Sequence, residues 1–419
     1  MKLLVLHRVP YAKINYHRGI DHTEHDVTYI GIDKALETIP RDLPCTRTAR
    51  PGAAGTAAEV IDWARAQGAQ FDRVVSMSEY ELLDAARVRE ALGVAGPLLE
   101  DVRKVRDKLL MKELVAAAGL HVPQALPLES LILHRPPQCW RGRTVLKPTD
   151  GASSEDVVVF ASVPALVQAV RARRTGVRKI DEAALLSGFE AEEFVSGPIV
   201  HFDGLVWQGE VQVVVGSRYI GTCLDYARGR PMGSVQFDIR ADRVEWVQKV
   251  VRAVGIEEGS FHLEAIEEGS GAGERLVFLE IANRVGGADV VDTFELATGI
   301  HMPSVELAMV TGRAPRVKKR APAGSRFGWF VFPGHHLGAG KCRLSGHEVY
   351  RRHPSMHRWN ELSAHAELPR HITYQAVEVP ASGVIATASH AGGTALLRRM
   401  FADIRVQSMP VRAVAEVAR

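Results

Sequence analysis

The sequence has few cysteines and no long apolar run. Its cysteines stand far apart in the chain: Cys45, Cys139, Cys223 and Cys342. They form no C-x-x-C pair, which argues against a zinc site or a redox motif, and such sparse cysteines fit a reducing cytoplasm. The apolar start ends at His7-Arg8 and is too short for a signal peptide. Because no stretch approaches the length of a membrane span, no membrane partner is expected.

Features of nucleic-acid binders and of two common nucleotide-binding motifs are also missing. The formal net charge is only +3, and no Lys/Arg block alternates with aromatic residues, so no nucleic-acid partner is expected. Nothing matches G-x-x-x-x-G-K-[ST], which excludes a Walker A loop. No G-x-G-x-x-G follows the first expected strand, which argues against a Rossmann dehydrogenase. An ATP site in this chain must therefore combine residues from separate segments.

The composition is that of a globular protein, with 46% hydrophobic and 24% charged residues over 419 positions. This length favours two to four packed units. Strand-like runs at 3–6, 27–30 and 73–76 alternate with helical spacing at 57–65 and 81–92. This alternation predicts a small parallel α/β domain over the first hundred residues.

Downstream of that domain the pattern changes to antiparallel strands. A helix is expected over 103–118, and the run 191–219 is expected to form strands that turn at Phe202–Leu205. The glycine cluster at 268–273 has no helix after it and is interpreted as a hairpin turn. A polar loop is expected at 225–230 and a linker at 313–323. Other elements are expected as follows: strands at 144–146, 157–160, 261–266, 276–281, 327–332 and 374–379, and helices at 244–254, 293–311 and 394–402.

Two lysines in different segments have the surroundings of a phosphate site. Lys108 follows Asp107 at a helix start, and Lys147 ends a strand just before the Gly/Ser loop at 150–154. An ammonium is a compact charge suited to phosphate oxygens, and a Gly/Ser loop lets backbone N–H groups approach them. Either lysine taken alone is better explained as an ordinary surface residue.

Two further segments suit the base and the metal of a nucleotide. Residues 192–195 lead from an acidic pair into an apolar strand, which can present main-chain groups and apolar walls to a purine. Glu264 and Glu280 lie on neighbouring expected strands, where two carboxylates can face each other and hold Mg²⁺. In the polar loop at 225–230, Arg228 or Arg230 can reach a γ-phosphate or a substrate carboxylate.

The order of these segments resembles the motifs of the ATP-grasp superfamily over roughly residues 1–312. The motifs are Asp107-Lys108, Lys147-Pro148 with its loop, 192–197, 261–264 and 280–284. Within that superfamily the chain looks most like carboxylate–amine ligases, the group of L-amino acid ligases and carnosine-synthase-type dipeptide ligases. The resemblance implies an α/β fold in four parts. These are an N-terminal parallel α/β domain (1–100), a small ATP-grasp subdomain (101–195), a large subdomain with the metal site (196–312) and a C-terminal α+β domain (325–419).

The resemblance also assigns roles by position. ATP would contact Lys108, Lys147, Ser153, Ser154, Glu192, Glu193, Phe194 and Val195. Magnesium or manganese would be held by Glu264, Glu280 and Asn283. Arg284 and Arg228 would serve the acyl phosphate or a substrate carboxylate.

The sequence departs from the superfamily pattern at two places. Ile199 occupies the position where an acidic residue often binds ribose, so Asp203, His201 or water would replace it. Asn283 lies three residues after Glu280 rather than two, and on a strand the third residue points to the opposite face. It would reach the metal only if the strand has already turned, whereas Arg284 stays on the face of Glu280.

The implied activity is a ligase reaction on small molecules. A carboxylate would be activated by ATP as an acyl phosphate and then attacked by an amine, and a homodimer is possible because such ligases often form dimers. Two alternatives remain open at this stage: a carrier-protein thiol as the acceptor, and an ATP-binding regulatory protein that has lost catalysis. The C-terminal histidines, His365 among them, lack zinc-ligand spacing and are interpreted as surface or packing residues.

Overall fold

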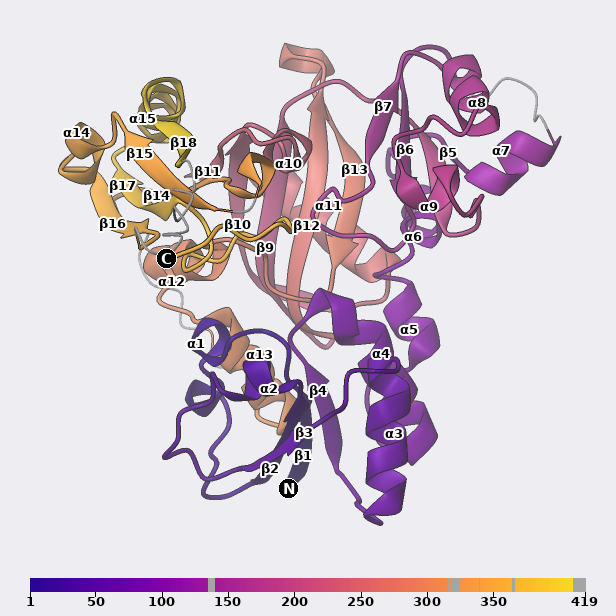
Figure 1. Ribbon diagram of the computed structural model, residues 1–419, viewed down its shortest axis with the longest axis vertical. Helices are drawn as coiled ribbons and strands as arrows, with labels where there is room; N and C mark the ends of the chain where they lie inside the picture. Colours follow the sequence, from indigo (N-terminus) through magenta and orange to yellow (C-terminus); the bar gives the residue numbers. More distant parts are fainter. Residues whose placement is uncertain (135–139, 316, 318–323, 339, 364–365, 410–419) are drawn as a thin grey trace, which may run out of the picture.

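The computed structural model describes residues 1–134, 140–315, 317, 324–338, 340–363 and 366–409. Cys139, His365 and most of the expected linker at 313–323 lie outside this part of the chain. Within it, no helix is both long and apolar enough to cross a membrane. Figure 1 shows an N-terminal part at the bottom, a large central sheet, a small sheet at the upper right and the C-terminal part at the upper left.

The N-terminal part contains a parallel sheet, as the alternating pattern predicted. Its strand order is β3-β2-β1-β4. The bounds are Lys2–Leu6 for β1, Asp26–Gly31 for β2, Thr46–Ala49 for β3 and Arg73–Ser76 for β4. Alternate residues of β1 pack on opposite faces: Leu3 and Val5 in one buried cluster, Leu4 and Leu6 in the other.

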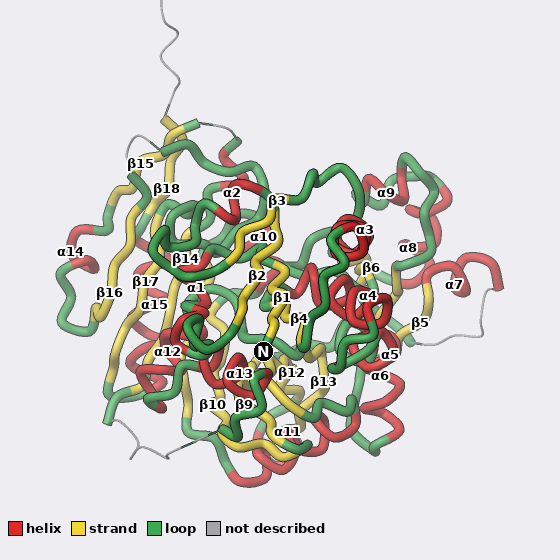
Figure 2. The backbone as a smooth tube through the Cα atoms, turned by 90° about the horizontal axis from the view of Figure 1, so that it is seen from below, coloured by secondary structure: helices red, strands yellow, loops and turns green. Residues whose placement is uncertain are grey.

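Helices cover both faces of this parallel sheet. Figure 2, seen from below, shows α3 and α4 on one side of it and α1 and α2 on the other. The helices run over Tyr11–Ile14 for α1, Asp33–Leu36 for α2, Thr56–Ala66 for α3 and Leu82–Leu92 for α4.

A second, smaller sheet follows two helices. The helix expected over 103–118 is interrupted: α5 spans Leu99–Arg103 and α6 spans Lys108–Ala117. The Asp107 carboxylate accepts hydrogen bonds from the N–H groups of Leu109 and Leu110, which makes Asp107 the N-cap of α6. The antiparallel sheet has the order β5-β8-β6-β7. Its elements are β5 Ala125–Pro127, α7 Leu128–His134, β6 Thr144–Pro148, β7 Val158–Phe160, α8 Val163–Arg171, α9 Arg178–Asp181 and β8 Phe189–Glu193.

The central sheet has eight strands in the order β13-β12-β9-β10-β11-β14-β17-β16, and every neighbouring pair is antiparallel. The C-terminal strands therefore extend the same sheet. Its strands are β9 Ile199–Trp207, β10 Glu210–Ile220, β11 Met232–Phe237, β12 Glu258–Glu268, β13 Arg275–Ala282, β14 Arg326–Phe332, β16 Met356–Glu361 and β17 Ala381–Thr387. The other elements are α10 Cys223–Ala227, α11 Ala241–Ala253, α12 Val290–Thr298, α13 Met302–Val310, β15 Lys341–Ser345, α14 Glu348–Arg351, α15 His390–Asp403 and β18 Arg405–Met409.

The turn predicted at Phe202–Leu205 is wrong. Strand β9 runs straight through it, and the hairpin turns at Gln208 and Gly209, both with positive φ. Gly204 lies inside the strand. Glycine is needed at this position because a Cβ would stand 2.3 Å from the Val213 carbonyl oxygen. The Asp203-Gly204 pair marks a position where two backbones approach closely. In the sequence alone, such a pair cannot be distinguished from a turn.

Three other expectations also differ from the structure. The helix expected over 293–311 is broken at Gly299, whose φ of +78° ends α12. The expected loop at 225–230 begins inside the short helix α10. Residues 374–379 form no strand, and the strand of that region is Ala381–Thr387. The hairpin turn between β12 and β13 is confirmed at the glycine cluster.

Candidate active site

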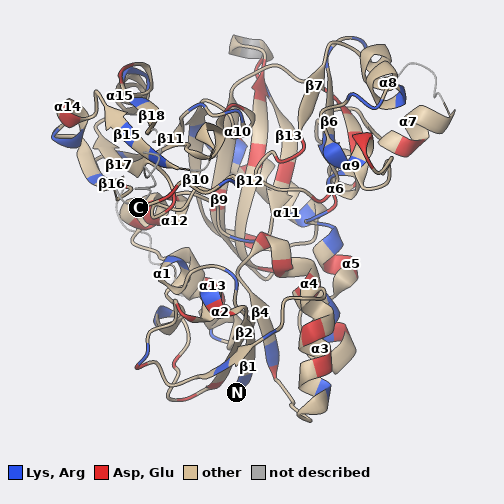
Figure 3. Ribbon diagram, viewed as in Figure 1, with Lys and Arg blue, Asp and Glu red and all other residues tan. Residues whose placement is uncertain are grey.

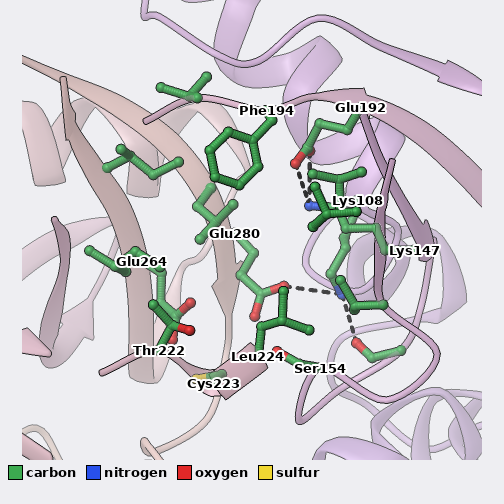
Figure 4. A pocket seen from close by; sticks show the side chains of 18 of the residues that line it. Lys108, Lys147, Ser154, Glu192, Phe194, Thr222, Cys223, Leu224, Glu264 and Glu280 are labelled. Atoms are coloured by element: carbon green, nitrogen blue, oxygen red, sulfur yellow. Dashed lines mark hydrogen bonds and ion pairs between the residues drawn. The ribbon is translucent and has the colours of Figure 1, made fainter. Parts of the chain in front are cut away.

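A cavity of about 340 Å³ opens between the small sheet and the central sheet. The residues predicted from separate motifs meet around it, with two exceptions. Those lining it are Lys108, Lys147, Ser153, Ser154, Glu192, Glu193, Phe194, Val195, Arg228, Glu264 and Glu280. Figure 4 shows Glu264 and Glu280 on one side and Lys108 and Lys147 on the other.

Lys108 joins three parts of the cavity. It is the first residue of α6, and its Nζ donates to the Gly151 carbonyl at 2.6 Å. The same Nζ lies 3.1 Å from Oε2 of Glu280. Since the side chain is 8% exposed, this ammonium lies in the wall of the cavity rather than at the surface. It already places one positive charge between the glycine loop and a predicted metal ligand.

Lys147 belongs to a buried cluster of two lysines and two glutamates. Its Nζ lies 2.9 Å from Oε1 of Glu192, and Lys112 Nζ lies 2.6 Å from Oε1 of Glu190. Burial disfavours the ammonium of Lys147, but Glu192 and Glu190 outweigh it and raise its pKa, so Lys147 stays charged. Lys112 and Glu190 were not predicted. The sequence did carry a signal for them. Lys112 follows Lys108 by four residues on a helix, and Glu190 precedes Glu192 by two on a strand, so each pair shares a face.

The segment after β8 forms an apolar slot. Phe194 and Val195 line the cavity together with Ile199, and the Arg143 guanidinium carbon lies 3.7 Å from the centre of the Phe194 ring. The N–H of Glu193 donates to the Gln124 carbonyl at 2.8 Å. An adenine contact at Glu193 would therefore use its carbonyl.

Glu264 and Glu280 face each other across two hydrogen-bonded strands. They are direct partners in the antiparallel register of β12 and β13, and the register shifts immediately afterwards. In Figure 3, acidic positions stand part-way along these strands. Burial disfavours the ionised form of Glu280, but Lys108, Lys147 and Arg284 lower its pKa to about 2. Two opposed oxygen donors with a cation already against one of them fit the donor set that Mg²⁺ requires.

Arg284 does not line this cavity. Its Nε donates to Oε2 of Glu79 at 2.7 Å, and Arg106 bonds to the other oxygen of the same carboxylate. Burial raises the pKa of Glu79, but Arg284 and Arg106 overcome that effect and keep it below its usual value. The Glu79 carboxylate of the N-terminal part thus pairs with Arg284, the residue predicted to bind a substrate carboxylate.

The structure does not bring Asn283 to the two glutamates. Its side-chain amide donates to the carbonyls of Ser260 at 2.8 Å and Glu258 at 3.2 Å. It lines a different cavity, which it shares with Glu306. Strand β13 ends one residue earlier, at Ala282, and Asn283 points away from the face that carries Glu280.

The chain was compared with known proteins. A curated relative, the L-arginine-specific L-amino acid ligase of Bacillus subtilis, is 25% identical over 272 residues, which span 63% of this chain and 63% of the relative. The solved L-amino acid ligase from Bacillus licheniformis superposes with a TM-score of 0.71 at 19% identity over 98% of both chains. The chain has the ATP-grasp fold.

A more distant ATP-grasp neighbour superposes over nearly the whole chain. The biotin carboxylase domain of the Hydrogenobacter thermophilus 2-oxoglutarate carboxylase, a dimer solved with MgADP and bicarbonate, gives a TM-score of 0.64 at 14% identity. The superposition covers 98% of this chain and 91% of that one. No protein-family model matches the chain. The comparisons do not support a carrier-protein thiol acceptor or a regulatory protein without catalysis.

In this fold the C-terminal part holds the segment that carries Arg228. Arg228 is the C-cap of α10, and the Tyr226 hydroxyl in that helix donates to the Thr373 carbonyl at 2.5 Å. The Tyr226 ring stacks on Tyr374 with centroids 4.6 Å apart. His335 Nε2 bonds to the Ala227 carbonyl at 3.1 Å, which makes this histidine a packing residue of the site wall.

Neither replacement considered for the ribose contact lines the ATP-grasp cavity. His201 and Asp203 are 1% and 2% exposed, and Nδ1 of His201 lies 2.6 Å from Oδ2 of Asp203. The other Asp203 oxygen lies 2.7 Å from Nδ1 of His262. The acidic side chain that does line the cavity beside Arg228 is Asp225, which sequence reasoning placed in a loop but did not assign to ribose.

Proposed function

We propose that this protein is an ADP-forming ligase that uses ATP and Mg²⁺ to activate a carboxylate as an acyl phosphate and joins it to an amine. The observation that carries the proposal is the opposed pair Glu264 and Glu280, with the Lys108 ammonium 3.1 Å from Glu280, in one cavity. Amino acids are the proposed substrate class, because the curated relative and a whole-chain structural neighbour are L-amino acid ligases.

The residues of the cavity divide the work of phosphoryl transfer. Lys108 and Lys147 are charged donors placed for phosphate oxygens. A magnesium ion held by Glu264 and Glu280 would supply further positive charge to the phosphates. Arg284, held in place by Glu79, adds positive charge near Glu280 and is proposed to steady the acyl phosphate or the substrate carboxylate electrostatically. This arrangement acts by positioning and charge, which is what phosphoryl transfer needs.

The loop after β6 is the proposed cover of the cavity. Lys108 holds the Gly151 carbonyl, and Arg106 bonds to the Asp150 carbonyl. Ser153 and Ser154 have φ values of +58° and +55°, a left-handed conformation that is unfavourable for residues other than glycine. A loop fixed at its base by two cations and strained at its tip can re-form over bound nucleotide and keep water from an acyl phosphate.

The test is ADP release with ATP and Mg²⁺ across a panel of amino acids, singly and in pairs. We expect ADP and a new amide only with certain pairs, and with one carboxylate alone when hydroxylamine replaces the amine. Glu280→Gln removes a metal ligand and should abolish release. Its matched control is Glu268→Gln at the end of β12, whose carboxylate pairs with Arg275 and is not among the residues that line the cavity.

The possible outcomes separate the steps of the proposal. Hydroxamate formation without amide product in any pair would retain acid activation but contradict an amino-acid amine as acceptor. Tight nucleotide binding with no ADP release under any condition would contradict ligase activity itself. Equal loss of activity in Glu268→Gln would show that the effect of Glu280→Gln is not specific to the metal site.

Location and assembly are proposed on narrower support. Cys45, Cys223 and Cys342 are free thiols, which fits a reducing cytoplasm. A homodimer is proposed because one neighbour with the same fold was solved as a dimer. Light scattering coupled to gel filtration would measure the mass, and a monomer at micromolar concentration would contradict the dimer.

A further inference from the structure

Five buried or half-buried side chains beside the metal face form a continuous hydrogen-bonded network that spans four neighbouring strands. From β11, Ser234 Oγ lies 2.7 Å from Nε2 of His201 on β9. The His201 and His262 rings, on β9 and β12, flank Asp203 at 2.6 and 2.7 Å, one on each carboxylate oxygen. We call these residues, together with Tyr219 of β10, the histidine network.

The histidine network ends on one oxygen of Glu264. The Tyr219 hydroxyl donates to Oε1 of Glu264 at 2.7 Å, and Nε2 of His262 lies 3.3 Å from the same oxygen. The Tyr219 ring stacks on His201 with centroids 4.5 Å apart, so the position of the tyrosine depends on the rest of the network. None of the described residues forms a hydrogen bond or ion pair with Oε2 of Glu264.

We propose that Tyr219 is a positioning residue for metal binding. This proposal rests on the proposed function: Tyr219 holds Oε1 of Glu264, which leaves Oε2 free to bind the metal. Removing a partner that orients a metal-binding carboxylate typically costs about 10- to 100-fold in metal affinity or activity. The strands fix only the Cβ of Glu264, and the carboxylate still needs partners to select one orientation.

The same residues also suggest a different reading, a metal inside the network. His201, Asp203 and His262 each offer a ligand atom, and these atoms lie within 4.8 Å of one another. However, each imidazole is bonded through both ring nitrogens, and both Asp203 oxygens are used. Hydrogen bonds therefore satisfy this cluster without an ion, and the proposal assigns it to positioning.

The test measures metal binding directly. Mn²⁺ would be titrated into protein saturated with a non-hydrolysable ATP analogue, and free Mn²⁺ would be followed by electron paramagnetic resonance. Tyr219→Phe keeps the ring and removes the hydroxyl, so we expect about a tenfold weaker Mn²⁺ site. Binding of the analogue without metal should be unchanged, a pattern that a general loss of structure would not produce.

Two further variants control this result. Ser234→Ala removes the far end of the network without touching Glu264. We expect it to weaken Mn²⁺ binding as well, but by less than Tyr219→Phe does. Tyr350→Phe is the matched control, because that hydroxyl also bonds to a carboxylate, Asp403, but lies at the C-terminal helix away from the cavity. It should leave Mn²⁺ affinity as in the unsubstituted protein.

Wild-type Mn²⁺ affinity in a folded Tyr219→Phe protein would overturn the proposal. So would one equivalent of tightly held metal in the purified protein that is lost in His201→Ala, because the cluster would then be a metal site. If the unsubstituted protein binds Mn²⁺ and nucleotide but releases no ADP, the positioning role stands while the ligase proposal fails. Thermal unfolding of each variant shows which proteins are folded enough to compare.

Discussion

At the residue scale, charged side chains of this site pair with one another, and a bound ligand would have to break some of these pairs. Lys108 bonds to Gly151 and to Glu280. A metal at Glu280 would compete with this ammonium, which would then be free to move to a phosphate. The lysine thus neutralises a half-buried carboxylate whose charge would otherwise be unpaired.

Lys108→Gln is expected to reduce kcat about 10²- to 10³-fold, the usual cost of one charged donor at a site of developing charge. It should also destabilise the protein, because Glu280 loses its nearest cation. The double variant Lys108→Gln/Glu280→Gln should recover stability but not activity. Steady-state kinetics and denaturant unfolding measure the two effects. The control is Lys104→Gln. This lysine lies one turn before Lys108 and pairs with Asp101.

A second residue-scale prediction concerns Glu306, in the cavity that Asn283 also lines. Burial raises its pKa to about 7 from an ordinary value of 4.5. The stability linked to this proton is full below pH 4.5 and is lost as pH rises to about 7. Since the cavity admits some water, we expect Glu306→Gln to be more stable than the natural protein by about 2 kcal/mol at pH 8 and equal at pH 4. Urea unfolding at both values tests this, and a constant difference would contradict it.

At the element scale, the start of α6 decides where Lys108 points. The preceding residue, Asp107, caps the helix through two N–H groups, and the Lys108 N–H donates to the Thr149 carbonyl at 2.8 Å. Helix and glycine loop are therefore aligned by backbone bonds before any ligand arrives. The short polar segment at 104–107 separates the end of α5 from the start of α6.

Asp107→Ala is expected to cost about 1 kcal/mol of stability through the lost cap and to raise the KM for ATP. Ser162→Ala removes a comparable cap from α8, where Ser162 accepts from the Ala165 N–H at 3.3 Å. It should cost similar stability with unchanged KM. Thermal unfolding and ATP titration distinguish the two, and an equal effect on KM would contradict a positioning role for the cap.

At the scale of the whole molecule, one carboxylate ties the N-terminal part to the ATP-grasp core. Glu79 follows the last strand of the parallel sheet, and it bonds to Arg106 ahead of α6 and to Arg284 after β13. The carboxyl edge of a parallel sheet is where such folds place ligands. Movement of the N-terminal part would therefore change the position of Arg284 directly.

Glu79→Gln should destabilise the protein by about 3 kcal/mol, because the buried Arg106 and the largely buried Arg284 lose their shared negative charge. It should also raise the KM for the carboxylate substrate, since Arg284 is no longer held. Glu295→Gln breaks the pair with Arg18, an exposed bridge between the N-terminal part and α12. That control should cost less than about 1 kcal/mol and leave KM unchanged. Equal effects from both substitutions would contradict a special role for Glu79.

The sequence by itself determined the local chemistry and the order of the parts. Hydrophobic periodicity predicted three of the four parallel strands, because strand and helix burial repeat every two and about 3.6 residues, but it missed the largely exposed β3. The motifs brought together in the cavity were recognisable from their order along the chain, which resembles that of the ATP-grasp superfamily. The resemblance assigned Asn283 to the metal, whereas strand alternation placed it on the opposite face unless the strand had turned, and its amide bonds to Ser260 and Glu258.

The tertiary structure alone decided which distant side chains meet. Gly204 appeared to be a turn because the sequence carries no record of the Val213 carbonyl and the Phe261 ring that pack against it. Glu79 and Arg284 are 205 residues apart, and no local pattern predicts that they pair. His201, Asp203, His262 and Tyr219 form one network only because the strand order sets β12 beside β9 and β9 beside β10. Periodicity fixes the face a side chain occupies, whereas pairing between strands fixes its neighbours.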